Sequence, residues 1–445
     1  MVVEGWLTRA AAQRPEHTAL RTPRGSCSYA QLHAAARAGA ERLRERGAVA
    51  GTRVAIALPG GLELAEALHA CLLLGAVAVP VDLRLAPAER ELICTGCEIL
   101  VEEPLADGRG GGAPAAAGAL STHDLDATAV VIHTSGTTAS PRPVELTYGN
   151  LLWSALGSAV ALGADPCERW LCALPVSHVG GLSILLRSTI GATTAIVHER
   201  FEVDRVLDAL DREQVTLVSL VARTLTRLLD AGLARPPALR CALTGGGHVP
   251  PALLERARAA GVPVSLTYGL TESCSQVTTT PVAEIGPDRA SAGPPLFCTR
   301  VRIAPDDEIL VRGPTVAPAA AAPDGWLRTG DLGSLDARGR LRVTGRKADT
   351  IVSGGENVAP AEVEAVLEAH PGVREAAVLG RPDPRWGEAV TAIVVARPGI
   401  ELEAEELRAH CAAALASYKV PKRVLLRGEP LPRTRSGKLL RRDLL

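Results

Sequence analysis

Residues 128–138 read Thr-Ala-Val-Val-Ile-His-Thr-Ser-Gly-Thr-Thr. A short run of β-branched and other apolar residues, typical of a buried strand, ends in four hydroxyl side chains around one glycine. Such a turn can offer backbone N–H groups and hydroxyls to a polyphosphate, and Gly136 lets the backbone approach the ligand closely. The chain has no G-x-x-x-x-G-K-[ST] sequence, so we expect a phosphate loop that is not of the Walker A kind.

Helical and strand patterns alternate before and after this loop. Leu32–Arg46 and Leu62–Leu74 have the pattern of helices, whereas Arg53–Leu58 and Ala76–Val81 have that of short buried strands. The alternation continues to about residue 300. This order predicts βαβ units and a largely parallel sheet, which is an α/β architecture.

The length and a change of pattern predict two domains. A chain of 445 residues is too long for one ordinary core. From 303 to 345 the pattern changes to short strands with tight turns, and a compact α+β unit follows Arg346. We therefore expect an N-terminal domain of residues 1–345 and a C-terminal domain of residues 346–445.

Composition excludes several classes of protein. The formal net charge of −1 gives no overall field that would attract nucleic acid or anionic lipid. The longest apolar stretch, Ala67–Val81, is too short to span a bilayer, and Met1–Trp6 does not resemble a signal peptide. Of the ten cysteines only Cys94 and Cys97 have ligand-like spacing, so we expect no structural metal. These features predict a cytoplasmic protein without a membrane span or a nucleic-acid partner.

Lysine is rare in this chain. Of the 48 lysines and arginines only Lys347, Lys419, Lys422 and Lys438 are lysine, and all four lie in the last hundred residues. Where arginine is used so widely, a retained lysine can mark a site that needs a compact charge on a flexible stem. Surface positions without such a role are the alternative for three or all of them.

Five further polar or glycine-rich segments accompany the hydroxyl loop. The three glycines of Leu243–His248 can let a flat ring lie against the backbone, and Thr267–Glu272 supplies an aromatic face, a hydroxyl and a carboxylate. Trp326–Asp331 is expected to place a carboxylate at a strand end, where it suits ribose hydroxyls. Gly345–Asn357 crosses the domain boundary, and Arg433–Lys438 carries a lysine on a Gly/Ser turn.

With these six segments in this order, the chain resembles the ANL adenylating superfamily of acyl-CoA synthetases, peptide-synthetase adenylation domains and luciferases, from about residue 5 to 445. The resemblance implies a large N-terminal domain of parallel-rich sheets and helices with a small β-barrel-like subdomain, then a small mobile α+β domain. It also implies two reactions. ATP converts a carboxylic acid to an acyl-adenylate, and coenzyme A then displaces AMP. ATP, Mg²⁺ and coenzyme A are the implied cosubstrates, and the small domain rotates between the two steps.

The resemblance implies a role for each matching residue. Lys438 would stabilise the adenylation transition state, Thr271 would meet the α-phosphate, and Glu272 would hold Mg²⁺. Asp331 and Arg346 would bind the ribose. The other matches are the phosphate loop Thr134, Ser135, Gly136, Thr137 and Thr138, then Gly245, Gly246, Gly247, Tyr268 and Gly269 around the adenine, and Gly354 and Gly355 at the thiol channel.

A narrower resemblance concerns the acyl group. Ala173–Arg187, Ser273–Thr278 and Ser291–Leu296 resemble the o-succinylbenzoate–CoA ligases of menaquinone biosynthesis. That acid has two carboxylates, one to be activated and one to be anchored. The candidate substrate residues, between which the sequence does not choose, are His178, which is also a candidate catalytic residue, Arg187, Ser275, Gln276 and Thr278. The competing interpretations are a surface position for Arg187 and a core position for His178.

Some residues depart from the family pattern. Ala139, Arg142 and Pro143 stand where many members have Gly, Lys and Gly, which predicts a stiffer phosphate loop, and Ala348 replaces a polar hinge residue. Three other functions stay open. The enzyme could activate a different aryl or fatty acid, or load a carrier protein, or the chain could be a non-catalytic nucleotide-binding protein. A homodimer is also left open.

Overall fold

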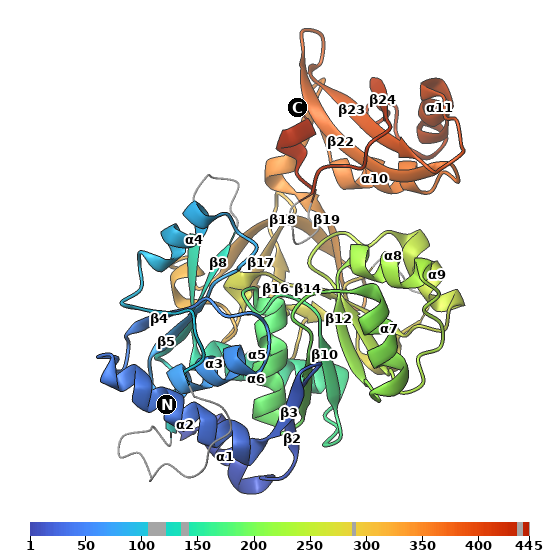
Figure 1. The fold of residues 1–445 in the computed structure, drawn as a ribbon. Coiled ribbons are helices and arrows are strands. Elements are labelled where there is room, and N and C mark those ends of the chain that lie inside the picture. The colour runs from blue at the N-terminus through green and yellow to red at the C-terminus, as the bar shows by residue number, and fades with distance from the viewer. Residues whose placement is uncertain (106–121, 135–141, 287–290, 434–438, 445) are drawn as a thin grey trace.

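The computed structural model describes residues 1–105, 122–134, 142–286, 291–433 and 439–444. Figure 1 shows a large N-terminal part in blue to yellow, with a smaller orange-to-red C-terminal part at its upper end. The fold is α/β followed by α+β, as the sequence predicts.

The strand that leads to the hydroxyl loop belongs to a five-stranded sheet. Its first four strands in space are parallel, and the last is antiparallel to its neighbour. In spatial order they are β6 (Ile99–Val101), β4 (Arg53–Ile56), β5 (Val77–Pro80), β8 (Thr128–Thr134) and β9 (Arg142–Thr147).

A second sheet of eight strands carries most of the other motifs. Its six inner strands run parallel, and an antiparallel strand lies at each edge. In spatial order they are β15 (Thr278–Thr279), β14 (Val264–Tyr268), β13 (Cys241–Thr244), β12 (Leu217–Leu220), β10 (Arg169–Cys172), β11 (Thr194–Val197), β2 (Thr18–Thr22) and β3 (Gly25–Ser28).

Helices cover both faces of these two sheets, which is why their parallel strands are mostly apolar and buried. Strand β4 shows the division, since Val54 and Ile56 join the central core and Ala55 joins the core on the opposite face. The central helices are α1 (Trp6–Gln13), α2 (Tyr29–Glu45), α3 (Leu62–Leu74), α5 (Tyr148–Leu162) and α6 (Val179–Gly191); the outer ones are α4 (Pro87–Cys94), α7 (Val203–Arg212), α8 (Ala222–Asp230) and α9 (Pro251–Ala259).

Three smaller sheets complete the chain. One strand pair, β1 (Val2–Glu4) with β7 (Thr122–Asp124), fixes the N-terminus. An antiparallel sheet then forms from β16 (Arg300–Ile303), β17 (Glu308–Arg312), β18 (Leu327–Leu335) and β19 (Leu341–Arg346). The C-terminal unit consists of β20 (Ile351–Ser353), β21 (Glu356–Val358), β22 (Val373–Asp383), β23 (Gly387–Ala396) and β24 (Arg423–Arg427), with α10 (Pro360–Glu368) and α11 (Ala404–Ala414).

Local sequence signals set the ends of several helices. Ser28 caps α2, since its hydroxyl accepts from the N–H of Gln31 while the Gln31 side chain accepts from the N–H of Ser28. Thr147 and Asn150 make the same reciprocal pair at α5. Helix α3 coincides with the predicted helix 62–74, whereas α2 begins three residues before the predicted Leu32. The sequence analysis does not predict the long hairpin of β22 and β23. Most of β23 is buried on both faces, so its residues lack the alternation of apolar and polar side chains that marks a strand.

Among the described residues, no helix is both long and apolar enough to cross a bilayer.

Two histidines are buried in the central core as neutral rings. Burial lowers the pKa of His69 to about 3 and that of His123 to about 4. The Nε2 atom of His69 lies 3.2 Å from the Thr189 hydroxyl, and the His123 ring stacks on Tyr148 at 4.4 Å. Since both pKa values are depressed in the folded state, their contribution to stability is complete above about pH 6.5 and is lost as pH falls toward 4 and 3.

We therefore expect the His69→Gln variant to lose less stability in acid than the wild type. Between pH 6.5 and 5, protonation of His69 in the unfolded chain alone costs about 2 kcal/mol of unfolding free energy. Glutamine keeps a hydrogen-bonding side chain and does not titrate. Urea unfolding at pH 7 and pH 5 measures the difference, and an equal loss in both proteins contradicts it.

Candidate active site

The strand β8 ends at the first residue of the predicted phosphate loop. Thr134 pairs with Arg142 across β8 and β9, and its hydroxyl donates to the Arg142 carbonyl at 3.3 Å. Pro143 on β9 pairs with His133 on β8. Strand β9 is an edge strand, where the missing N–H of a proline is tolerated. The ladder therefore closes the base of the loop. The remaining predicted residues, Ser135, Gly136, Thr137 and Thr138, and the altered Ala139, lie outside the described residues.

The glycine-rich and aromatic segments meet at the carboxyl ends of two neighbouring parallel strands. Gly245, Gly246 and Gly247 follow β13, and Tyr268 ends β14. Ligands of open α/β sheets bind at such strand ends. Gly269 is required there, because a Cβ at this position would lie 1.5 Å from the Ser275 carbonyl oxygen.

Thr271 and Glu272 follow in a short 3-10 turn. The Glu272 carbonyl accepts from the N–H of Ala317, and its carboxylate is half-buried. Among the described residues the Glu272 carboxylate forms no ion pair or hydrogen bond. A carboxylate left available in this way fits Mg²⁺, which proteins usually hold through one or two carboxylates together with substrate phosphates.

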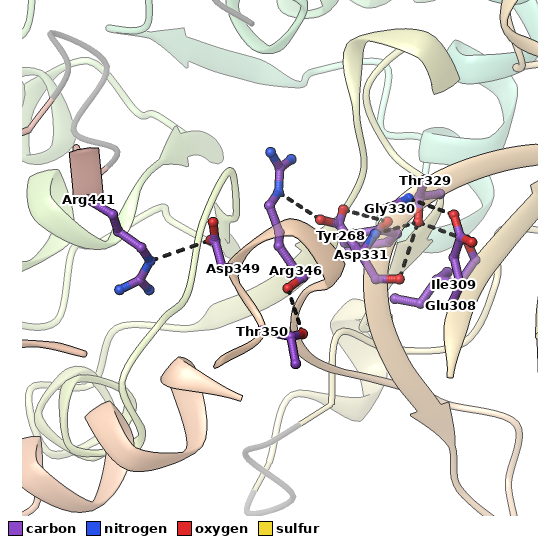
Figure 2. Close-up of polar contacts among 10 residues, drawn as sticks. All are labelled: Tyr268, Glu308, Ile309, Thr329, Gly330, Asp331, Arg346, Asp349, Thr350 and Arg441. Carbon is purple, nitrogen blue, oxygen red and sulfur yellow. Dashed lines mark hydrogen bonds and ion pairs between the residues drawn. The ribbon is translucent and has the colours of Figure 1, made fainter. Parts of the chain in front are cut away.

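Tyr268, Asp331 and Arg346 form one polar cluster (Figure 2). The Asp331 carboxylate accepts from the Tyr268 hydroxyl at 2.9 Å and from the Arg346 Nε at 2.8 Å. Asp331 is 6% exposed. Burial, reinforced by the Asp331 carboxylate, raises the pKa of Tyr268, so the phenol remains a donor.

The expectation that Asp331 lies at a strand end is wrong. It sits in the middle of β18, directly opposite Arg346 on β19. The pairing registers of β18 shift on both sides of it, and Gly330 has φ +70°. This irregularity, rather than a strand terminus, makes the Asp331 side chain available.

Helix α6 separates two of the candidate substrate residues. His178 is the residue before α6 and Arg187 lies near its other end, about 13 Å further along the axis at 1.5 Å per residue. The residues directly before His178 form no strand, since β10 ends at Cys172. The two side chains therefore belong to different surroundings.

His178 lies beside an ion pair. Its Nε2 is 3.6 Å from the Asp82 carboxylate and 3.4 Å from the Arg84 guanidinium, which binds Asp82 through two nitrogens. Burial lowers the pKa of His178, while the Asp82 carboxylate opposes this shift. The side chain is 39% exposed, so a core position is excluded.

Arg187 is a buried cation, not a surface residue, with only 8% of its area exposed. Its guanidinium donates to the Ser154 hydroxyl at 3.0 Å and lies 5.6 Å from the Trp170 ring centroid. Burial lowers its pKa to about 10, so it stays charged at neutral pH. Among the described residues it forms no ion pair, and its Nε has no hydrogen-bond partner.

Ser154 connects Arg187 to the segment that holds the other candidates. The Ser154 hydroxyl donates to the Cys274 carbonyl at 2.6 Å. Ser275 follows with φ +90°, an uncommon backbone conformation for a non-glycine residue. Gln276 is 1% exposed; its amide donates to the Thr279 hydroxyl at 2.7 Å, and its carbonyl oxygen has no partner in the described chain. The Thr278 hydroxyl is already used, because it donates to the Ala292 carbonyl.

The C-terminal candidates are described only in part. Gly354 and Gly355, both with positive φ, form the exposed two-residue turn between β20 and β21, where most other residues would be strained. Lys438 lies outside the described residues. The motifs assigned no role to Ser154, Asp82, Arg84 or Glu308. Only Glu308 had a signal in the sequence, a carboxylate directly before the apolar run of β17.

Comparison with known proteins identifies the family. The family model for AMP-binding enzymes matches residues 7–319, and that for the AMP-binding enzyme C-terminal domain matches residues 362–438. The chain belongs to the AMP-binding enzyme family. The ANL resemblance inferred from the motifs is thereby confirmed.

Several of the similar proteins are o-succinylbenzoate–CoA ligases. The 2-succinylbenzoate–CoA ligases of Bacillus subtilis and Geobacillus kaustophilus are 38% and 40% identical, over 99% of this chain and 97% and 96% of theirs. The solved o-succinylbenzoate CoA synthetase of Bacillus subtilis with its acyl-adenylate has a TM-score of 0.91 at 37% identity, covering 100% of this chain and 98% of that one. The same enzyme has been solved with ATP and magnesium ion, with a TM-score of 0.89 at 37% identity, 100% of each chain being covered.

The hydrogen bond from Tyr268 to Asp331 can be tested by mutation. The Tyr268→Phe variant keeps the ring but removes the donor to Asp331, so we expect AMP to bind about tenfold more weakly. Isothermal titration with AMP measures this. Tyr148→Phe is the matched control, since it removes a buried donor to the Leu72 carbonyl, far along the chain from the cluster. The control should lower the melting temperature and leave AMP affinity unchanged; the same AMP affinity in both variants would contradict the assignment.

Proposed function

We propose that this chain is an AMP-forming acid–thiol ligase that activates o-succinylbenzoate with ATP and transfers it to coenzyme A, a step of menaquinone biosynthesis. The observation that carries the proposal is the Tyr268–Asp331–Arg346 cluster beside Gly245–Gly247, a nucleotide-binding arrangement in a chain that matches 2-succinylbenzoate–CoA ligases over 99% of its length. The near-zero net charge, which gives no overall field for nucleic acid or anionic lipid, supports small-molecule substrates, and we propose a cytoplasmic location.

The chemistry proceeds in two displacements. A carboxylate oxygen of the acid attacks the α-phosphorus of ATP, pyrophosphate leaves, and an acyl-adenylate forms. The sulfur of coenzyme A then attacks the acyl carbon, and AMP leaves with the electrons of the broken C–O bond. Each displacement needs its charge stabilised where it develops.

We assign the roles as follows. Asp331 and Arg346 hold the ribose, Tyr268 and the Gly245–Gly247 backbone flank the adenine, and Thr271 contacts the α-phosphate. Glu272 holds Mg²⁺, which when bound neutralises charge on the phosphates. Lys438 supplies a positioned ammonium during adenylation.

We also propose that residues 1–345 and 346–445 act as two domains. In support, the antiparallel sheet ends at Arg346 and the next sheet begins at Ile351. Rotation at this connection would present different residues to the two reactions.

For the acid, we propose that Arg187 recognises the second carboxylate, with Ser275 and Gln276 beside it. In support, Arg187 is a buried cation that the described structure does not neutralise, and burying an unpaired charge is costly unless a ligand compensates it. His178 lies at the far end of α6 and would act near the reacting carboxylate.

Lys438 tests the division between the two reactions. Lys438→Ala should slow pyrophosphate release by about 100-fold or more, the effect of removing one key electrostatic donor. Thioester formation from pre-made acyl-adenylate should remain nearly normal. Lys419→Ala, which removes an exposed ion pair with Glu362, is the control and should leave both reactions unchanged. Equal loss of both reactions in Lys438→Ala would refute the two-step role.

Arg187 tests the choice of acid. The wild type should prefer o-succinylbenzoate over the analogue without the aryl carboxylate by about 100-fold in kcat/KM. Arg187→Met, similar in length but uncharged, should reduce that ratio to below about tenfold, chiefly by slowing the dicarboxylate. His178→Ala should lower kcat/KM for both acids by the same factor. A preference of the wild type for benzoate or a fatty acid would overturn the acid assignment and leave the adenylation chemistry standing.

A further inference from the structure

One buried carboxylate has no role in the proposed function and lies next to the polar cluster of Tyr268, Asp331 and Arg346. Glu308, the first residue of β17, is 6% exposed. Its Oε1 accepts from the N–H of Gly330 at 3.0 Å, and its Oε2 lies 3.3 Å from the Lys347 Nζ (Figure 2 shows Glu308 beside Gly330). One carboxylate therefore contacts both the residue before Asp331 and the segment that leads into the C-terminal unit.

The contact with Gly330 closes an irregularity in the sheet. Glu308 pairs with Leu332 and Leu310 with Arg328, so three β18 residues, 329–331, lie opposite Ile309 alone, two more than in a regular ladder. The Thr329 hydroxyl donates to the Ile309 carbonyl at 2.7 Å and accepts from the N–H of Asp331 at 3.1 Å. Bulges leave backbone groups without their ladder partners, and here Glu308 accepts from the N–H that Gly330 would otherwise leave unpaired.

The contact with Lys347 fastens the connection between the two sheets. Lys347 follows β19, and its ammonium also lies 2.6 Å from the exposed Asp306 carboxylate. The preceding Arg346 binds Asp331. Two consecutive basic residues thus hold the end of β19 to carboxylates on β18, on β17 and in the turn before β17.

The ion pairs before and after Ala348 lead to different parts of the molecule. Ala348 is exposed and has no polar side chain, and Asp349 then pairs with Arg441 of the C-terminal segment at 3.4 Å (Figure 2). The ion pairs therefore tie Lys347 to the N-terminal sheet and Asp349 to the C-terminal unit, while the Thr350 hydroxyl still donates to the Arg346 carbonyl at 3.3 Å.

We propose that Glu308 is a positioning residue with two connected effects: it holds the Gly330 bulge so that Asp331 faces the nucleotide, and through Lys347 it fixes the point at which the connection can begin to turn. The inference rests on the proposed function, since it concerns how Asp331 is held for the nucleotide and how the connection moves between the two reactions. Because one side chain makes both contacts, the nucleotide site and the start of the connection behave as one rigid unit.

The first experiment separates the two contacts by AMP titration. Glu308→Ala removes the acceptor of the Gly330 N–H, and Glu308→Asp is too short to reach it. Both variants should weaken AMP binding by at least about tenfold. Glu308→Gln should stay within about threefold of the wild type, because its amide oxygen can still accept from Gly330. Asp306→Asn is the matched control, since it removes the other carboxylate of Lys347 without touching Gly330, and it should bind AMP normally.

The second experiment concerns the ion pair. Glu308→Gln, Lys347→Met and the double variant all break it, so each should change the ratio of thioester formation to adenylation by about the same factor, which we expect to be about fivefold. Multiplied effects in the double variant would show that the two residues act independently and would overturn the proposed link. The KM for the acid should be unaffected in all three.

Several outcomes would overturn the inference. These are normal AMP binding in both Glu308→Ala and Glu308→Asp, equal losses in Glu308→Gln and Glu308→Ala, or a loss in Asp306→Asn. If Glu308→Ala does not fold, Glu308→Asp and Glu308→Gln still decide. A wild type that binds AMP but adenylates no acid would refute the proposed function alone, and one that does not bind AMP would refute both.

Discussion

The buried carboxylate of Asp331 joins strands that belong to different sheets. It accepts from Tyr268 at the end of β14 in the eight-stranded sheet and from Arg346 at the end of β19 in the antiparallel sheet. A buried carboxylate without such donors would be costly, so the two sheets are held in the one arrangement that supplies both. The nucleotide site and the path into the C-terminal unit both follow from that arrangement.

The acyl side of the molecule depends on a charge of the opposite sign. Arg187 is buried between α5, α6 and the strand that carries Trp170, with a hydroxyl and an aromatic face as its described partners. A guanidinium in this setting is stabilised only in part, and a carboxylate ligand would complete it. The two buried charges thus suit the two ends of a reaction between a nucleotide and a dicarboxylic acid.

The connection between the domains shows how a departure from a family pattern can be accommodated. By the family resemblance, Ala348 stands where many members have a polar residue, and the residues on either side of it form ion pairs with opposite parts of the molecule. We expect backbone rotation between the domains to begin at this residue, whose methyl side chain holds it to neither part. The lysine retained at 347 in an arginine-rich chain reaches two carboxylates with one compact charge.

The sequence by itself determined the class of fold, the family and the candidate residues of the nucleotide site. These depend on local patterns: apolar strands such as β8 that end in hydroxyls or glycines, and helices such as α3, an apolar run that ends at Gly75. Tertiary structure alone decided that Asp331 lies on a bulge within β18, that His178 and Arg187 have different surroundings, and that Ser154 and Glu308 matter. Register shifts between β17 and β18 and packing between α5 and α6 join residues far apart in the chain, and no local pattern encodes which of them will meet.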